Sequence, residues 1–485
     1  MSLRAVAAAI LLVAAIGPAS TSPAEAGHYG GLSVIAGPAE AGHYGAQAES
    51  IKTGAFVEKV ACANDATQTY TLYLPASYTP QRQWPVLFVF DPRGRGTMAA
   101  QIFKDAAERF GWIIASSDNT RSDGPWEPNR RAVAAMWPDV LTRYSVDARR
   151  IYIAGFSGGA GVATVVATST GHVSGIIAAG APDTGESEKA PPVAWFGAAG
   201  RLDFNFMDAS STDERMRRAG NPRRLEYFDG VHQWIPNAMA MRAAGWLEAL
   251  AMKDGRRARD EALASALRDA DVAAARALED EGRLTEAYRL YSSVIETFGD
   301  LTDVSAVRSK VSALDDDRRM ADARKEEQRA DRDERERARQ LARTLGELRA
   351  EDLPMLPMVL SSLRVETLKR DAQTAGYKAL AAQRTLELIF VQTSFYVWRD
   401  FEDKRDYARA ALCLEIAASI HPDRPRVWYD LAGDRAALRD QRSAVIALGR
   451  AIDAGFTDRA RLDADERFAS VRQSEEFGRV VARLR

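Results

Sequence analysis

The stretch Ile151–Ala163 reads IYIAGFSGGAGVA and predicts how this chain folds. Its first four residues are an apolar run typical of a buried strand, and small residues typical of a helix start follow the pattern Gly-x-Ser-x-Gly. A serine on so sharp a turn needs neighbours without a Cβ, and Gly155 and Gly159 meet that need. The layout predicts that Ser157 is a nucleophile on a strand-to-helix turn, with helix amides directed at it.

Short apolar strands alternate with helical segments from residue 51 to residue 252. This rhythm predicts an α/β domain with a doubly wound, mostly parallel sheet covered on both faces. The expected strands are 70–74, 85–90, 112–116, 151–154, 175–179, 193–197 and 225–228. The expected helices include 98–110, 130–144, 213–218 and 237–250.

Strand signals disappear from residue 253 to residue 485, and helix-forming residues at helical spacing predict an all-α domain there. Part of this domain repeats with a period of 34 residues. The positions Asp406, Ala410, Leu414 and Ala417 recur as Asp440, Ala444, Leu448 and Ala451. Residues 315–343 are almost wholly Asp, Glu, Lys, Arg and Ala, which predicts a solvated charged helix or a weak coiled coil.

Overall charge and composition exclude some partners. The 485 residues carry 65 Lys and Arg against 67 Asp and Glu, a formal net charge of −2. Such a balance creates no field that would attract nucleic acid or an anionic membrane. With 46% hydrophobic and 27% charged residues, the chain is expected to fold as a soluble protein of two or three domains.

Residues 1–26 have the pattern of a bacterial signal peptide, with Arg4 before the apolar stretch Ala5–Ile16 and a small-x-small cleavage site at 24–26. We therefore expect a periplasmic or secreted protein with no membrane span after signal removal. Residues 27–50 are expected to form a disordered linker, because they are rich in Gly, Ala and Pro. The segment PAEAGHYG at 23–30 recurs verbatim at 38–45. The repeat contains His28 and His43, but two histidines without acidic or thiolate neighbours make a poor metal site.

The histidines limit the choice of a general base for Ser157. Of the five in the chain, two lie in the linker and His421 lies in the helical domain. His172 ends the helix that begins at Ser157, about 22 Å along the axis, which is too far to reach back. His232 remains, in a loop after the last expected strand.

Asp203 is the expected acid partner of His232. It follows the strand 193–197 and gives the chain order Ser, Asp, His found in α/β-hydrolases. Its role would be to fix the imidazole tautomer and stabilise the imidazolium. Asp183 and Asp229 are competitors, although Asp229 suits a turn before Gly230 better.

An oxyanion hole is expected at the amide of Gly158, the residue after the nucleophile, together with an amide from the loop after strand 85–90. That loop begins Asp91-Pro92-Arg93-Gly94. Since Pro92 has no N–H, the second donor is expected to be Arg93 or, less favourably, Gly94.

Residues 51–252 resemble the α/β-hydrolase superfamily, and within it the esterase branch of polyhydroxybutyrate depolymerases and feruloyl esterases. The segments that carry the resemblance are YTLYLP at residues 70–75, the serine segment 146–160 and the His-x-Trp segment 230–236. The resemblance implies triad roles for Ser157, Asp203 and His232. The chain departs from this branch at the oxyanion loop, where Asp91-Pro92 replaces the usual His-Gly start. The C-terminal part is similar to tetratricopeptide proteins over about half its length.

The sequence thus predicts an exported serine esterase that needs no cofactor or metal and acts on a small-molecule or polymeric ester. Four aromatic residues are candidates for the substrate pocket: Trp126, Phe204, Phe206 and Trp234. A peptidase or a thioesterase would use the same triad, although no propeller domain of the prolyl-oligopeptidase type is apparent. A third hypothesis is a non-catalytic scaffold, since a fold does not guarantee activity. The helical repeats are expected to bind a protein or peptide, to form a dimer surface or to shield the hydrolase.

Overall fold

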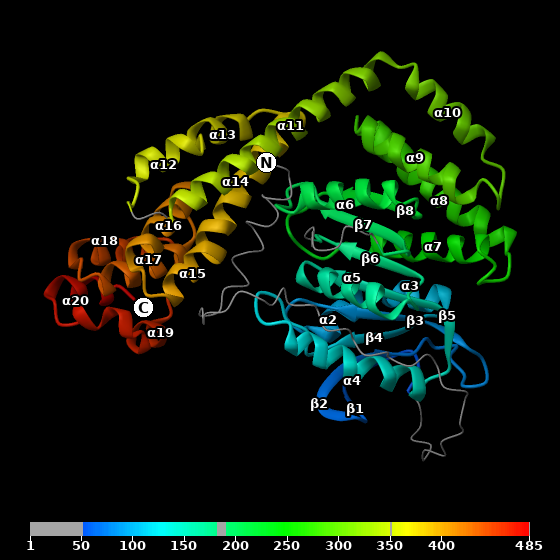
Figure 1. Cartoon of the computed structure of the whole chain (residues 1–485), viewed down its shortest axis with the longest axis horizontal. Coiled ribbons are helices and arrows are strands. Elements are labelled where there is room, and N and C mark those ends of the chain that lie inside the picture. The colour runs from blue at the N-terminus through cyan, green and yellow to red at the C-terminus, as the bar shows by residue number, and fades with distance from the viewer. Residues whose placement is uncertain (1–51, 182–190, 350–351, 485) are drawn as a thin grey trace, which may run out of the picture. The chain divides into compact units, whose positions relative to one another are not determined.

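The computed structural model describes residues 52–181, 191–349 and 352–484. These residues form two compact units, one ending at Lys325 and the other beginning at Glu326 (Figure 1). The long helix α11, Arg318–Glu347, carries the chain from the first unit, called here the sheet unit, into the second, called the helical unit. The expected signal peptide 1–26, the expected linker 27–50 and Asp183 all lie outside the described residues.

The sheet unit is built on an eight-stranded sheet with the order β1-β2-β4-β3-β5-β6-β7-β8. Strand β2 runs antiparallel to both β1 and β4, and all other neighbours are parallel. Every residue of β3, β4, β6 and β7 is buried, as expected for strands covered on both faces. The strands are β1 Phe56–Cys62, β2 Asp65–Tyr73, β3 Trp84–Phe90, β4 Ile113–Ser117, β5 Val146–Phe156, β6 Gly175–Ala179, β7 Ala194–Gly200 and β8 Arg223–Phe228.

Helices cover both faces of this sheet (Figure 1). Residues of α4, α5 and α6 join the core on one face, and residues of α2, α3 and α7 join the core on the other. The helices are α2 Gly96–Ile102, α3 Lys104–Phe110, α4 Glu127–Arg143, α5 Gly158–Thr170, α6 Phe206–Arg218 and α7 Asn237–Lys253. The predicted α/β class is confirmed, while β1 was not among the expected strands: it is a partly exposed edge strand with little apolar signal.

Three further helices complete the sheet unit: α8 Glu261–Asp280, α9 Leu284–Phe298 and α10 Ser305–Asp315. Helix α7 remains buried to its end, and its Ala249 and Met252 share an apolar cluster with residues of α8, α9 and α10. A buried ion pair adds to this contact, with Arg224 of β8 2.6 Å from Asp271 of α8. The compact unit therefore extends past the expected domain end at residue 252.

The helical unit packs its helices around one apolar cluster. The positions of the 34-residue repeat that carry Ala or Leu are all buried in it. At the corresponding helix starts, Asp406 accepts a hydrogen bond from the Arg409 amide and Asp440 from the Ser443 amide. The elements after α11 are α12 Leu356–Ser362, α13 Val365–Ala372, α14 Gly376–Val391, η2 Gln392–Tyr396, α15 Val397–Asp403, α16 Tyr407–Ile420, α17 Pro425–Ala437, α18 Gln441–Asp453, α19 Arg459–Ala464, η3 Glu466–Ser470 and α20 Glu475–Val481.

The charged segment expected at 315–343 forms most of α11, and it is not solvated on every side. Leu341 and Leu345 are buried in the core of the helical unit, and Glu334 forms a buried ion pair with Arg384 at 2.6 Å. Across the described ranges, no helix is both long enough and apolar enough to cross a membrane.

Candidate active site

Ser157 lies on the turn between β5 and α5, at the carboxyl end of a strand in the middle of the sheet. Its φ of 51° and ψ of −126° are values that L residues rarely adopt. A Cβ on Gly155 would lie 2.3 Å from the carbonyl oxygen of Gly159, and a Cβ on Gly159 would lie 2.0 Å from that of Phe90. The two glycines are therefore a steric requirement of the turn. With the strand order, this turn gives the unit an α/β-hydrolase fold.

His232 lies in the loop between β8 and α7. Its Nε2 is 2.9 Å from Ser157 Oγ, although 75 residues separate the two along the chain. The rings of Phe156 and Phe204 pack against the imidazole, with centroid distances of 4.7 and 4.3 Å. His232 Nε2 is thus within hydrogen-bond distance of the Ser157 hydroxyl, and two neighbouring rings restrain the imidazole.

Asp203 follows β7 and is completely buried. Its Oδ1 is 2.8 Å from His232 Nδ1 and also accepts a hydrogen bond from the Asn205 amide at 2.8 Å. Its Oδ2 has no hydrogen-bond partner among the described residues. Because a carboxylate can only accept, this contact places the imidazole proton on Nδ1 and leaves Nε2 free to accept the serine proton.

The other acid and base candidates lie elsewhere. The Asp229 side chain is 74% exposed and lies 3.6 Å from both Arg201 and Arg283, in a surface ion cluster. His172 is exposed at the end of α5. In the helical unit, His421 Nε2 is 2.6 Å from Glu387. The contacts of Asp229 and His421 thus involve neither Ser157 nor His232.

The expected oxyanion donors differ in their environments. The Gly158 amide begins α5, where the first amides of a helix lack an intrahelical acceptor. The Arg93 amide, in contrast, donates to Asp91 Oδ1 at 2.9 Å, and the Gly94 amide donates to the Asp91 carbonyl at 3.1 Å. The Arg93 amide, predicted as the second donor, is thus engaged by the Asp91 side chain in this structure.

The four aromatic pocket candidates have different neighbours. Phe204 packs against His232, as described above. Phe206 stacks on Tyr227 with a centroid distance of 4.2 Å, and Trp126 packs against the core on the α4 and α5 face. Trp234 is only 8% exposed, and its Nε1 donates to Asp91 Oδ2 at 2.8 Å. Trp234 is therefore a core residue with a polar partner, and Phe204 is the candidate that adjoins the triad.

Sequence reasoning missed Asp91 as a participant in this region. It is completely buried after β3, where a hydrophobic strand ends. Burial by itself would raise its pKa, but hydrogen bonds from Arg95, Trp234 and the Arg93 and Arg95 amides outweigh burial and hold the pKa below its ordinary value. The sequence signal that could have revealed Asp91 is the replacement of the usual His-Gly start of this loop by Asp91-Pro92.

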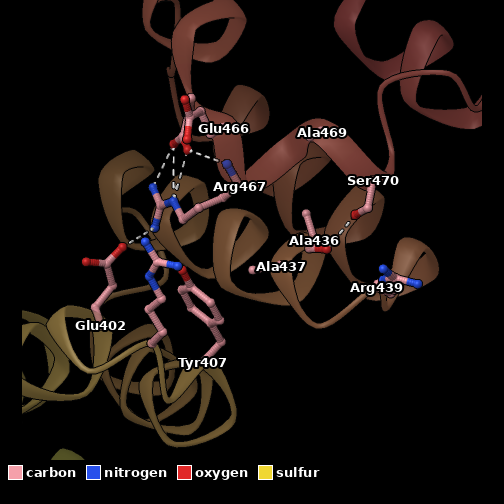
Figure 2. Close-up of a pocket in the computed structure, with 11 residues that line it drawn as sticks. Glu402, Tyr407, Ala436, Ala437, Arg439, Glu466, Arg467, Ala469 and Ser470 are labelled. Carbon is pink, nitrogen blue, oxygen red and sulfur yellow. Dashed lines mark hydrogen bonds and ion pairs between the residues drawn. The ribbon is translucent and has the colours of Figure 1, made fainter.

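A hollow of about 570 Å³ opens in the helical unit, between the ends of α15 and α17 and the turn η3 (Figure 2). Its central side chain is Arg467, which is 2.8 Å from Asp465, 3.2 Å from Asp434 and 3.7 Å from Glu402. Arg405, Arg439 and Glu466 also line the hollow. Its lining thus contains three acidic and three basic side chains.

Among the residues that the structure describes, no cluster of three or more His, Cys, Asp or Glu side chains could hold a metal ion. Cys62 and Cys413 are both buried and free. Burial, the largest cause, raises the pKa of the Cys62 thiol to about 12. Neither thiol is thus available as a thiolate nucleophile near neutral pH.

Several solved esterases resemble this chain. A ferulic acid esterase is 20% identical, with a TM-score of 0.33 over 37% of this chain and 91% of its own. The Pyrobaculum calidifontis esterase is 12% identical, with a TM-score of 0.35 over 41% and 87%. The S-formylglutathione hydrolase of Staphylococcus aureus is 14% identical, with a TM-score of 0.34 over 40% and 98%. No protein-family model and no curated protein matches the sequence.

Proposed function

We propose that this chain is a serine hydrolase that cleaves carboxylic esters through Ser157, His232 and Asp203. The observation that carries the proposal is the continuous line of contacts from Ser157 Oγ to His232 Nε2, at 2.9 Å, and from His232 Nδ1 to Asp203 Oδ1, at 2.8 Å. A nucleophile, a base within reach of it and an acid that orients the base are the minimum set for acyl transfer through a covalent intermediate.

The reaction would proceed in two halves. Ser157 Oγ attacks the ester carbonyl carbon while its proton passes to His232 Nε2, and the carbonyl oxygen takes up the negative charge near the Gly158 amide. The tetrahedral intermediate expels the alcohol, which receives the proton from His232, and an acyl-serine remains. A water molecule, deprotonated by His232, then attacks the acyl group and releases the acid and free Ser157. Asp203 stabilises the imidazolium throughout by accepting from Nδ1.

The choice of an ester substrate is supported by the resemblance of the serine and His-x-Trp segments to esterases. Thioesters and peptides require the same three groups, so the substrate class needs a direct test. We expect nitrophenyl esters, assayed as a series of increasing acyl length, to turn over faster than a matched acyl thioester or a peptide nitroanilide. A faster thioester or anilide would retain the triad and reassign the substrate.

Variants of the triad test the mechanism with matched controls in the same unit. Ser157→Ala should abolish turnover, and Asp203→Asn should lower kcat by about 10³–10⁴-fold, because the wrong imidazole tautomer would face the serine. Asp229→Asn and His172→Ala alter an exposed carboxylate and an exposed imidazole and should leave turnover within about twofold. Full activity in Ser157→Ala would refute Ser157 as the nucleophile, whereas a wild-type protein without turnover would favour the scaffold hypothesis.

We also propose that the protein is exported through residues 1–26 and that the helical unit, with its tetratricopeptide-like period, binds a protein or peptide. Export predicts that the chain without residues 1–26 stays in the cytoplasmic fraction while the full chain is found outside it. Retention of the full chain in the cytoplasm would contradict this part of the proposal.

A further inference from the structure

Asp91 ties together loops that are far apart in the sequence. Its Oδ1 accepts from the Arg93 amide at 2.9 Å and from the Arg95 amide at 3.2 Å, which wraps its own loop around the carboxylate. The Arg95 guanidinium donates to both oxygens, from Nε to Oδ1 at 3.0 Å and from Nη2 to Oδ2 at 2.8 Å. Oδ2 also accepts from Trp234 Nε1, 143 residues away, at 2.8 Å. If Asp91 stabilised only its own turn, the hydrogen bond from Trp234 would not be required.

Trp234 connects Asp91 to the base. It lies two residues after His232 in the loop between β8 and α7. Its ring packs on Phe156 with a centroid distance of 5.7 Å, and Phe156 packs on the His232 ring. The indole is therefore fixed at its polar end by Asp91 and at its apolar face by the residue that precedes Ser157. A shift of Trp234 would move the backbone of the base.

The backbone around Asp91 also reaches the nucleophile side of the site. The Asp91 carbonyl accepts from Thr120 Oγ1 at 2.9 Å, and the Pro92 carbonyl accepts from the Ser122 amide at 2.9 Å. Ser122 in turn lies against Gly158, where an added Cβ would be 2.4 Å from the Ser122 Cβ. The same residue pair, Asp91-Pro92, thus contacts both the loop of Ser122, beside Gly158, and the loop of His232.

We propose that Asp91 is a positioning residue of the active site, which holds the His232 loop in register with Ser157 through the indole N–H of Trp234. The inference rests on the proposed hydrolase function and deepens it. It also gives a physical reason for the departure from the His-Gly start. Hydrogen bonds from the loop amides keep the Asp91 carboxylate charged and fixed, and the carboxylate also accepts from Trp234. A side chain without two acceptor oxygens cannot serve all of these donors at once.

The test is a double-mutant cycle in the full-length protein with Asp91→Asn, Trp234→Phe and the combined variant. Trp234→Phe removes the donor of this contact, and Asp91→Asn replaces the charged acceptor by a neutral amide, so kcat for a nitrophenyl ester should fall about 10–100-fold in each variant with KM changed less than about threefold. The two effects should be strongly non-additive, because both changes act on the same contact. Asp434→Asn, a buried aspartate that also accepts from a tryptophan but lies in the helical unit, is the matched control and should keep wild-type kcat.

A spectroscopic measurement separates this inference from the proposed function. The indole N–H resonance of Trp234, assigned by its loss in Trp234→Phe, should lie downfield in the wild type and move upfield in Asp91→Asn. Single variants with wild-type kcat, or additive effects in the cycle, would overturn the positioning role of Asp91 while leaving the triad intact. A wild-type protein without hydrolase activity would instead refute the proposed function, and the resonance would still report whether the contact exists. If Asp91→Asn does not fold, Trp234→Phe still tests the inference by itself, because it removes the indole N–H and retains an apolar ring: wild-type kcat in this variant would overturn the positioning role.

Discussion

Two buried aspartates, one in each unit, accept a hydrogen bond from a tryptophan Nε1, and their surroundings move their pKa values in opposite directions. Asp91 in the sheet unit is bonded to Trp234 and Arg95, and its pKa is lowered. Asp434 in the helical unit accepts from Trp398 at 3.0 Å and lies 3.2 Å from Arg467, yet burial, the dominant cause, raises its pKa to about 7.

The difference lies in the number of donors and in the neighbouring charges. Asp91 receives two backbone amides in addition to its side-chain donors, and Arg95 serves it as a direct ion-pair partner. Asp434 instead accepts from a tryptophan side chain and shares Arg467 with the carboxylates of Asp430 and Asp465. A buried carboxylate therefore stays charged when the backbone supplies donors, and a shared guanidinium is not enough.

The largest expected effect comes from removing the Asp91 carboxylate, which accepts more hydrogen bonds than the carboxylate of Asp434. Asp91→Ala leaves the Trp234 indole, two amides and the Arg95 guanidinium without their acceptor, which should destabilise this region by about 3–5 kcal/mol. Hydrogen exchange measured by mass spectrometry should show faster exchange in residues 84–95 and 229–236 and no change in the helical unit. Unchanged exchange around both loops would mean that Asp91 does not hold them together.

Asp434→Asn should have a smaller effect that depends on pH. Because the folded pKa of Asp434 lies above its unfolded value, this group stabilises the helical unit fully below about pH 4 and loses that contribution as pH rises through about 7. The shift corresponds to at most about 4 kcal/mol. Urea unfolding of the helical unit, followed between pH 4 and pH 8, should therefore show a flatter stability profile in the variant. Parallel profiles for variant and wild type would remove the contrast with Asp91.

The smallest expected effect is that of Trp398→Phe. The change removes one donor from Asp434, so the pKa of Asp434 should rise further, by about one unit for a hydrogen bond of about 1.5 kcal/mol. Carbon-13 NMR of the Asp434 carboxyl, recorded across the same pH range, would give the midpoint directly. A midpoint that falls would show that the indole does not stabilise the charged form.

The contacts among Ser157, Asp203 and His232 could be predicted from the sequence because each of these residues lies in the turn or loop that follows a recognisable strand. Ser157, Asp203 and His232 come after β5, β7 and β8, and the carboxyl ends of parallel strands lie along one edge of a sheet. The glycines at 155 and 159 could be interpreted on steric grounds alone. Local sequence and chain order were sufficient for these residues.

Other features depended on contacts that local sequence does not contain. The sequence predicted an available amide at Arg93, because Pro92 before it has no N–H. In the folded loop, this amide donates to the Asp91 side chain. Trp234 was expected to line the substrate pocket. The local sequence does not show its hydrogen bond to Asp91, because Asp91 is 143 residues away in the chain. The extension of the sheet unit beyond residue 252 depends on the apolar end of α7, whose partners lie on three later helices.

The most direct measurement of the central claim is the site of covalent modification by a fluorophosphonate, identified by peptide mass spectrometry of the full-length protein. The Ser157 contacts predict a single adduct on the peptide that contains Ser157, formed slowly when His232 is replaced by Ala and absent when Ser157 is replaced by Ala. An unmodified wild-type protein, or an adduct on another serine, would contradict the assignment of Ser157 as the nucleophile.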